Sequence, residues 1–175
     1  MLGAQLQAGE RVLIHGGAGA VGVFAIQLSR WRGAHVLTTA SGRDRDFLLR
    51  LGAQRAIDYH TERFEDVAKD VDVVFDAVGG STLQRSWDVL GPGGRLVIIV
   101  STVKSADDER TKQALFFVEP NRRQLCDIAA MLDAGQLRPV VGTVLPFAQA
   151  AVAYPREPMR NHRPGKTVVT VIPPG

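Results

Sequence analysis

The sequence has only one cysteine, Cys126, in 175 residues, and it has no long hydrophobic run. A single cysteine excludes a disulfide framework and a metal cluster built on cysteines. No stretch approaches the roughly 20 consecutive apolar residues that a membrane-spanning helix needs, and the first residues do not read as a secretory signal peptide. These absences favour a reducing compartment, so we expect a cytoplasmic protein without membrane contact.

A strong excess of one charge is lacking as well. The 21 basic and 18 acidic residues leave a formal net charge of +3, and the basic residues are scattered along the chain. This pattern does not indicate a nucleic acid partner, and it fits a domain that holds an anionic small molecule. The four histidines, at positions 15, 35, 60 and 162, lie far apart and none is paired with cysteine at ligand spacing. We therefore predict no metal site.

Three catalytic patterns are also missing. The G-x-S-x-G motif of many hydrolases is absent. A Gly-Lys-Thr triplet occurs at residues 165–167, near a predicted terminal strand, and not directly after a glycine-rich loop as in a P-loop. Neither Tyr59 nor Tyr154 is followed by lysine at the Tyr-x-x-x-Lys spacing of short-chain dehydrogenases, which disfavours that class.

The chain does contain an alternation of short apolar segments with amphipathic or charged ones. The patterns predict strands at residues 11–15, 35–40, 55–59, 71–78, 95–100 and 114–118, and helices at residues 20–31, 43–51, 62–69, 81–90 and 121–134. Beyond these we expect an extended segment at 140–145, a short helix at 148–154 and a strand at 167–172. The glycines and proline of residues 91–94 are expected to separate a helix from the strand after it.

The fold class follows from the order and character of these segments. Residues 71–78 and 95–100 are almost continuously apolar, which is typical of parallel strands covered on both faces. Repeated strand–helix–strand order predicts an α/β fold, namely a Rossmann-type doubly wound parallel sheet in a three-layer α/β/α arrangement. We find no repeat or low-complexity linker and expect one domain over residues 1–175.

An apolar stripe marks the predicted helix at residues 121–134. Leu125, Ile128, Ala129 and Leu132 recur there at helical spacing. We interpret the stripe as a face packed against the core, with Cys126 at its margin as a packing residue.

The most informative stretch joins the first predicted strand to the first predicted helix. Gly17, Gly19 and Gly22 follow the spacing G-x-G-x-x-G. Gly17 permits a tight turn, Gly19 leaves room for a pyrophosphate, and Gly22 lets the helix approach the strand. The helix N-terminus offers free N–H groups and a positive dipole end to phosphates. This context indicates dinucleotide binding, and a purely structural glycine turn is the alternative.

The choice between NAD and NADP depends on the end of the second predicted strand. NAD-binding proteins of this fold carry an acidic residue about 20 residues beyond the glycines, where it holds the ribose 2′-hydroxyl. Here Ser41 is followed by Arg43 and Arg45, and Asp44 stands between the two arginines. A hydroxyl with two arginines favours a 2′-phosphate, so we predict NADP (NADPH) as the cofactor. The alternative is that both arginines are solvated charges at a helix start.

Residues 6–22 resemble the start of the cofactor domain of the medium-chain dehydrogenase/reductases, and the zinc-free quinone oxidoreductase-like branch fits best. Further matching motifs follow in the family's order, at residues 51–53, 57–59, 76–80, 91–95, 116–121, 144–147 and 165–169. The resemblance covers nearly the whole chain. Members of the family also have an N-terminal GroES-like domain that supplies much of the substrate cleft, and we expect the present sequence to be the cofactor domain only.

The resemblance implies cofactor-binding roles for matching positions. The pyrophosphate would be bound by the glycine loop, with Gly17, Gly19, Ala20, Val21 and Gly22. The adenosine phosphate would be bound by Ser41, Arg43 and Tyr59, and the ribose would be lined by Val78 and Gly79. The nicotinamide would be faced by Val100, Ser101, Phe116, Phe117 and Val118, and Lys166 would lie near the phosphates. For Tyr59 and Lys166 the alternative is a plain surface position. One of the two phenylalanines belongs in the core.

These features predict the cofactor domain of an NADPH-dependent oxidoreductase that transfers hydride to a quinone, an enone or a carbonyl compound. The alternative is a non-catalytic NADPH-binding module, such as a redox sensor or one chain of a split enzyme. We identify no residue that could act as a general acid or base beside the nicotinamide. We therefore predict no catalytic residue in this chain and little turnover by this chain alone. The small-molecule substrate is expected to bind through the GroES-like domain. A homodimer is possible from the sequence, which does not fix the oligomeric state.

Overall fold

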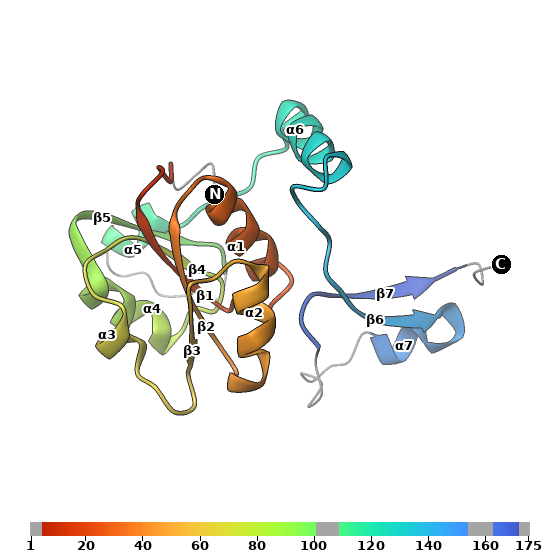
Figure 1. Ribbon diagram of the computed structural model, residues 1–175, viewed down its shortest axis with the longest axis horizontal. Coiled ribbons are helices and arrows are strands. Elements are labelled where there is room, and N and C mark those ends of the chain that lie inside the picture. The colour runs from red at the N-terminus through yellow and green to blue at the C-terminus, as the bar shows by residue number, and fades with distance from the viewer. Residues whose placement is uncertain (1–4, 101–108, 154–162, 172–175) are drawn as a thin grey trace.

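A five-stranded parallel sheet forms the centre of the computed structural model, which describes residues 5–100, 109–153 and 163–171 (Figure 1). Its strands lie in the order β3-β2-β1-β4-β5. Their bounds are β1 Arg11–His15, β2 His35–Ala40, β3 Arg55–Asp58, β4 Val71–Asp76 and β5 Leu90–Ile98. The chain moves from β1 outward to β3 and then crosses back to β4 on the other side of β1. The strand order therefore reverses beside β1, which is where ligands bind in open α/β sheets.

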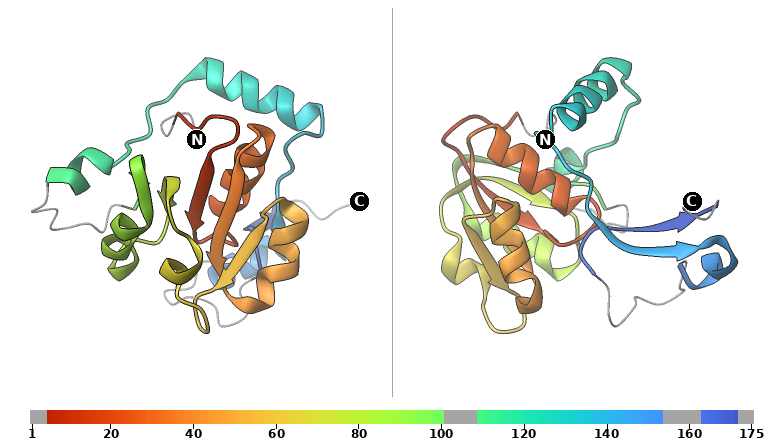
Figure 2. Two further views of the ribbon diagram at one scale, coloured as in Figure 1. Left: turned by 60° about the vertical axis from the view of Figure 1, so that its left-hand side comes forward. Right: turned by 45° about the vertical axis from the view of Figure 1, so that its right-hand side comes forward.

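Helices cover both faces of this sheet, as the two views of Figure 2 show. One face carries α1 Gly22–Trp31 and α2 Arg45–Leu51, and the other carries α3 Phe64–Val67, α4 Ser81–Ser86 and α5 Glu109–Ala114. Short 3₁₀ turns precede α2 at η1 Gly42–Asp44 and follow α4 at η2 Trp87–Val89. Alternate residues of β1 serve the two faces, with Ile14 in the cluster beneath α1 and Leu13 in the cluster on the opposite side. The predicted three-layer α/β/α architecture is confirmed.

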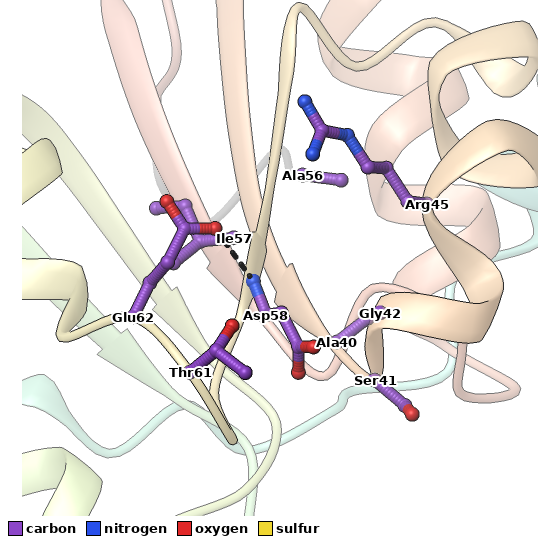
Figure 3. A pocket seen from close by; sticks show the side chains of 9 residues that line it. All are labelled: Ala40, Ser41, Gly42, Arg45, Ala56, Ile57, Asp58, Thr61 and Glu62. Atoms are coloured by element: carbon purple, nitrogen blue, oxygen red, sulfur yellow. Dashed lines mark hydrogen bonds between the residues drawn. The ribbon is translucent and has the colours of Figure 1, made fainter.

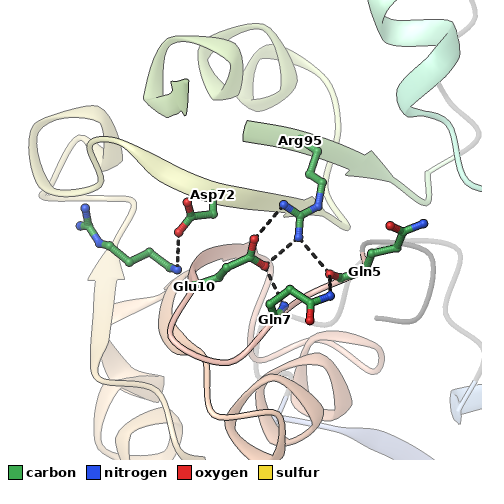
Figure 4. A network of polar contacts seen from close by, with 6 residues as sticks. Gln5, Gln7, Glu10, Asp72 and Arg95 are labelled. Atoms are coloured by element: carbon green, nitrogen blue, oxygen red, sulfur yellow. Dashed lines mark hydrogen bonds and ion pairs between the residues drawn. The ribbon is translucent and has the colours of Figure 1, made fainter. Parts of the chain in front are cut away.

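An ion pair closes the amino end of the sheet. The guanidinium of Arg95 in β5 donates to both carboxylate oxygens of Glu10, at 2.9 and 2.7 Å, and also to the carbonyl of Gln5 (Figure 4). The hydrogen bonds from Arg95 lower the pKa of the Glu10 carboxyl below its usual value. Asp72 accepts from the backbone N–H of Arg11 at 2.8 Å. These contacts fix the segment before β1 to β4 and β5, at the end of the sheet opposite the glycine loop.

The C-terminal part adds a second, smaller sheet. After α6 Arg122–Asp133, strands β6 Val141–Pro146 and β7 Lys166–Thr170 pair in parallel with each other and do not extend the five-stranded sheet. Between them lie η3 Phe147–Gln149 and α7 Ala150–Ala153. The side chain of Gln27 in α1 exchanges two hydrogen bonds with the backbone of Arg138, at 2.9 and 3.0 Å. A single domain over residues 1–175 stays a prediction.

The strand predicted at residues 114–118 is wrong. Residues up to Ala114 belong to α5, and only Leu115 forms an isolated parallel bridge, with Ile98. Residues 116–118 are apolar but exposed, so no packing partner draws them into the sheet among the described residues. The predicted break at residues 91–94 is also wrong, because β5 already begins at Leu90 and pairs with β4 across an irregular register.

The packing predicted for the helix at residues 121–134 is wrong as well. Asn121 caps α6 as its side chain accepts from the N–H of Gln124, but no residue of α6 is buried. Leu125 is 65% exposed, and Cys126 is exposed too. The helix lies apart from the five-stranded sheet (Figures 1 and 2). Helical periodicity therefore predicted the helix correctly, but the described part of the chain does not cover its apolar stripe.

Candidate cofactor-binding site

The glycine loop turns the chain from β1 into α1 with almost no free space at two of its glycines. A Cβ atom at Gly17 would lie 2.0 Å from the hydroxyl oxygen of Thr38, and one at Gly22 would lie 2.2 Å from the carbonyl oxygen of Gly16. Both positions therefore exclude a side chain because of packing. Among the described residues, a Cβ at Gly19 would meet only the carbonyl oxygen of Gly16, at 3.1 Å. Gly19 thus leaves the mouth of the loop accessible.

The start of α1 adds a suitable place for an anion. No side chain caps this helix, and its first turn holds no acidic residue. The N–H groups of Val23 and Phe24 already donate to the carbonyls of Gly19 and Val21, at 3.1 Å each, so a ligand would meet the N–H groups that precede them. The helix dipole places partial positive charge at the same end. A phosphate at this end would meet both features.

A groove of about 490 Å³ runs along the carboxyl edge of the sheet from this loop. It brings together nine of the residues that the sequence predicts for cofactor binding, namely Gly19, Ala20, Val21, Gly22, Ser41, Arg43, Tyr59, Val78 and Val100. These residues come from the glycine loop and the first residue of α1, from the segments just after β2 and β3, and from the segments after β4 and β5. The groove thus lies at the point where the strand order reverses.

The two arginines predicted to hold a 2′-phosphate do not lie together. Arg43 is exposed in η1 and lines the groove with Ser41. Arg45 starts α2 and lines a separate small cavity of about 140 Å³, and its guanidinium points away from Ser41 (Figure 3). Tyr59, just beyond β3, is 60% exposed and lines the groove. Arg43 is therefore the arginine placed for a ligand in the groove.

A buried carboxylate shapes the turn after β4. Asp76 is fully buried, and its Oδ1 accepts hydrogen bonds from the N–H groups of Val78 at 2.8 Å and Gly79 at 2.9 Å. Its Oδ2 has no hydrogen-bond partner among the described residues. This turn leaves Val78 half-exposed in the groove, whereas Gly79 is buried and lies outside the lining. Sequence reasoning missed Asp76 as a supporting residue, although an acid that ends an apolar strand before two glycines is a usable signal.

His15 lies beneath the groove in a structural role. Its ring nitrogens hydrogen-bond the hydroxyls of Thr39 at 3.0 Å and Ser86 at 3.1 Å, and its ring packs edge-on against Phe64. Burial lowers the pKa of His15 to about 4, with the charge of Asp76 opposing the shift. The imidazole is therefore neutral at neutral pH. It lines an inner cavity of about 390 Å³ that shares Tyr59 and Val78 with the groove.

The other predicted residues lie outside the groove lining. Phe116, Phe117 and Val118 are exposed beyond the edge next to β5, and Ser101 lies outside the described residues. Lys166 is exposed at the start of β7. Its neighbour Gly165 donates its N–H to the carbonyl of Ala18 in the glycine loop at 3.1 Å. The backbone before Lys166 is thus adjacent to the loop, and a role of Lys166 near the phosphates stays a prediction.

In the described part of the chain, no three His, Cys, Asp or Glu side chains gather in a way that could hold a metal ion. No described helix is long and apolar enough to cross a membrane.

The fold and the groove together define a Rossmann-type nucleotide-binding protein. The chain belongs to the zinc-binding dehydrogenase family, whose model matches residues 51–169, and thereby to the medium-chain dehydrogenase/reductases. The predicted family is confirmed.

Individual relatives agree with this assignment. The chain is 32% identical to the mitochondrial NAD(P)H oxidoreductase RTN4IP1 of Danio rerio over 93% of this chain and 49% of that protein. It is 33% identical to a chloroplastic NADPH-dependent alkenal/one oxidoreductase of Arabidopsis thaliana, over 97% of this chain and 42% of that protein. Among solved structures, the quinone oxidoreductase of Coxiella burnetii superposes with a TM-score of 0.86 at 31% identity, over 98% of this chain and 56% of that one. The chain therefore spans about half the length of these relatives.

Proposed function

We propose that this chain is the cofactor domain of an NADPH-dependent oxidoreductase. The observation that carries the proposal is the groove, which joins the glycine loop and the uncapped start of α1 to Ser41, Arg43 and Tyr59. A dinucleotide needs these features in this order, with its pyrophosphate at the helix start and its adenosine end near the tips of β2 and β3.

The preference for NADPH over NADH rests on the adenosine end. Arg43 supplies a permanent positive charge, and the Ser41 hydroxyl supplies a donor beside it. A 2′-phosphate accepts strong charge-assisted hydrogen bonds from such groups, whereas a 2′-hydroxyl gains less from them. The end of β2 itself carries no carboxylate where an NAD-specific acid would stand, although Asp44, a few residues further on, lines the groove beside Arg43.

When bound, NADPH would supply the hydride, and the residues of this chain would hold and orient the cofactor. The loop from Gly19 to Gly22 would hold the pyrophosphate, and Val78 and Val100 would exclude water from the far end of the groove. Lys166, next to the loop through Gly165, would add positive charge near the phosphates. The proposed acceptors are quinones and α,β-unsaturated carbonyl compounds, because the names of the relatives specify a quinone, an alkenal or alkenone, and a 2-methylene-furan-3-one.

Binding and turnover should be measured separately. Calorimetric titration of the 175-residue chain with NADPH and with NADH should give micromolar or tighter binding of NADPH and weaker binding of NADH. Equal affinity for both would reject the NADP assignment, and no binding of either would reject the proposal as a whole.

Turnover by the 175-residue chain alone should be low. Hydride transfer needs a cleft that orients both reactants and excludes water, and such orientation contributes as much as about 7–11 kcal/mol to lowering a barrier. We propose that a GroES-like domain supplies the other wall of that cleft. NADPH oxidation with a quinone and enone panel, with and without such a domain, tests this, and fast saturable turnover by the chain alone would contradict it.

The second candidate is a non-catalytic NADPH-binding module. The apolar face of α6, which the described part of the chain leaves exposed, favours it as a surface for contact with another protein. This second candidate predicts the same binding of NADPH, and it predicts no turnover either with or without a GroES-like domain. A homodimer and a cytoplasmic location stay predictions. Two of the relatives have names that place them in mitochondria and chloroplasts.

A further inference from the structure

The ends of β2 and β3 place an acidic side chain directly behind the turn that would face the 2′-phosphate. Ala40 of β2 is in register with Asp58 of β3, and the N–H of Tyr59 donates to the carbonyl of Ala40 at 3.2 Å. A Cβ atom at Gly42 would lie 2.3 Å from Oδ2 of Asp58. The carboxylate therefore packs against the backbone of Gly42, as Figure 3 shows.

This carboxylate has no ion-pair partner in the described part of the chain. Its Oδ1 accepts from the N–H of His60 at 3.0 Å, and none of the ion pairs there includes Asp58. Glu62, in the same cavity, is paired with Arg55. The guanidinium of Arg45 lines the cavity but extends away from Asp58 (Figure 3).

We infer that Asp58 is a specificity-determining residue that opposes Arg43 and limits the preference for a 2′-phosphate over a 2′-hydroxyl. The inference rests on the proposed function. Gly42 stands between Ser41 and Arg43 in the chain, and the Asp58 carboxylate packs behind it in the neighbouring cavity. A phosphate held in the groove by those two side chains would therefore have this carboxylate on the far side of the turn. Two negative groups this close repel each other, while an uncharged hydroxyl experiences no such repulsion. Asp58 therefore acts through its charge and reduces the affinity for NADPH more than that for NADH.

The test uses Asp58→Asn, which keeps the shape of the side chain and an acceptor for the N–H of His60. Calorimetry compares 2′-phospho-ADP-ribose with ADP-ribose, since these probes differ only in the 2′-phosphate. We expect the variant to bind the phosphorylated probe roughly three- to tenfold more tightly and ADP-ribose within about twofold of wild type. The gain should shrink as salt rises from low to physiological concentration.

Asp66→Asn is the matched control, because it removes the same charge from an exposed position on α3 outside the cavity and the groove. It should leave the ratio of the two affinities unchanged. Asp58→Ser removes the charge with a different side chain and should reproduce the gain, so the test does not depend on one variant folding well.

The outcomes separate the inference from the proposed function. If wild type binds the phosphorylated probe and Asp58→Asn leaves the ratio unchanged, the inference is overturned while the proposed function stands. If the variant binds that probe more weakly, Asp58 supports the turn rather than opposing the phosphate, and the inference is again overturned. If wild type binds neither probe, the proposed function fails and the inference fails with it.

Discussion

The carboxylate of Glu65 in α3 and the guanidinium of Arg85 in α4 form a paired contact across the wall of the inner cavity, with one bond at 2.6 Å. The Arg85 guanidinium also lies over the ring of Phe64, 4.6 Å from its centre. The hydrogen bonds from Arg85 lower the pKa of Glu65 from 4.5 to about 2. This pair adds a polar contact between two short helices that already share a hydrophobic cluster through Phe64 and Leu83.

Glu65→Gln should destabilise the chain at neutral pH and make it less sensitive to acid. Because the folded-state pKa lies below the ordinary value, the pair stabilises the fold above about pH 4.5, and this contribution is lost as the pH falls from there toward 2. We expect a loss of about 1 kcal/mol at pH 7, since Arg85 is partly exposed, and a smaller loss at pH 3. Urea unfolding at both values measures this.

Glu109→Gln is the control for that experiment. Glu109 pairs with Lys112 at 3.3 Å on the surface of α5, where both side chains are more than half exposed. Its loss should change the free energy of unfolding by no more than a few tenths of a kcal/mol. Equal effects of the two substitutions would contradict the role given to Arg85.

Gly19→Val should abolish cofactor binding while leaving the fold intact. The new side chain would occupy the mouth of the loop, and Gly19 has no positive φ that would strain it. Gly22→Ala should instead destabilise the fold by about 1–3 kcal/mol, because its Cβ would lie 2.2 Å from the carbonyl oxygen of Gly16. Circular dichroism with NADPH titration distinguishes the two. Normal affinity in folded Gly19→Val would mean that the glycines are only structural.

Arg43→Ala should weaken NADPH binding at least about tenfold and leave NADH binding nearly unchanged. One charge-assisted hydrogen bond to a phosphate contributes roughly 1.5–3 kcal/mol. Arg45→Ala, which removes the arginine that lies outside the groove, should change NADPH binding by less than about threefold. Titration of both variants with both cofactors is the measurement, and equal losses would show that the two arginines act together after all.

Asp76→Ala should destabilise the chain and weaken NADPH binding together. The substitution leaves the N–H groups of Val78 and Gly79 without their acceptor, at a cost of about 1–3 kcal/mol, and frees the turn that lines the groove. Asp76→Asn keeps an acceptor oxygen and should retain most of both properties. Chemical unfolding and cofactor titration test the pair, and identical behaviour of Asn and Ala would reject the hydrogen-bond explanation.

Local sequence pattern determined much of this protein. Residues 11–15 and 35–40 were predicted as strands with the bounds that β1 and β2 have, because short segments rich in apolar and β-branched residues between glycine turns favour strands. Asn121 was likewise a readable cap for α6. The glycine spacing predicted a loop whose packing leaves no room for side chains at Gly17 and Gly22. These features depend on neighbours along the chain, so the sequence alone contains them.

Which residues distant in sequence come into contact depends on the tertiary structure. The register of β2 with β3 brings Asp58 against Gly42, and the turn into α2 directs Arg45 away from the groove that Arg43 lines. The same holds for α6, whose apolar stripe resembles a buried face although the described part of the chain leaves it exposed. Periodicity reports which side of a helix is apolar, but only the packing of other elements decides whether that side is covered.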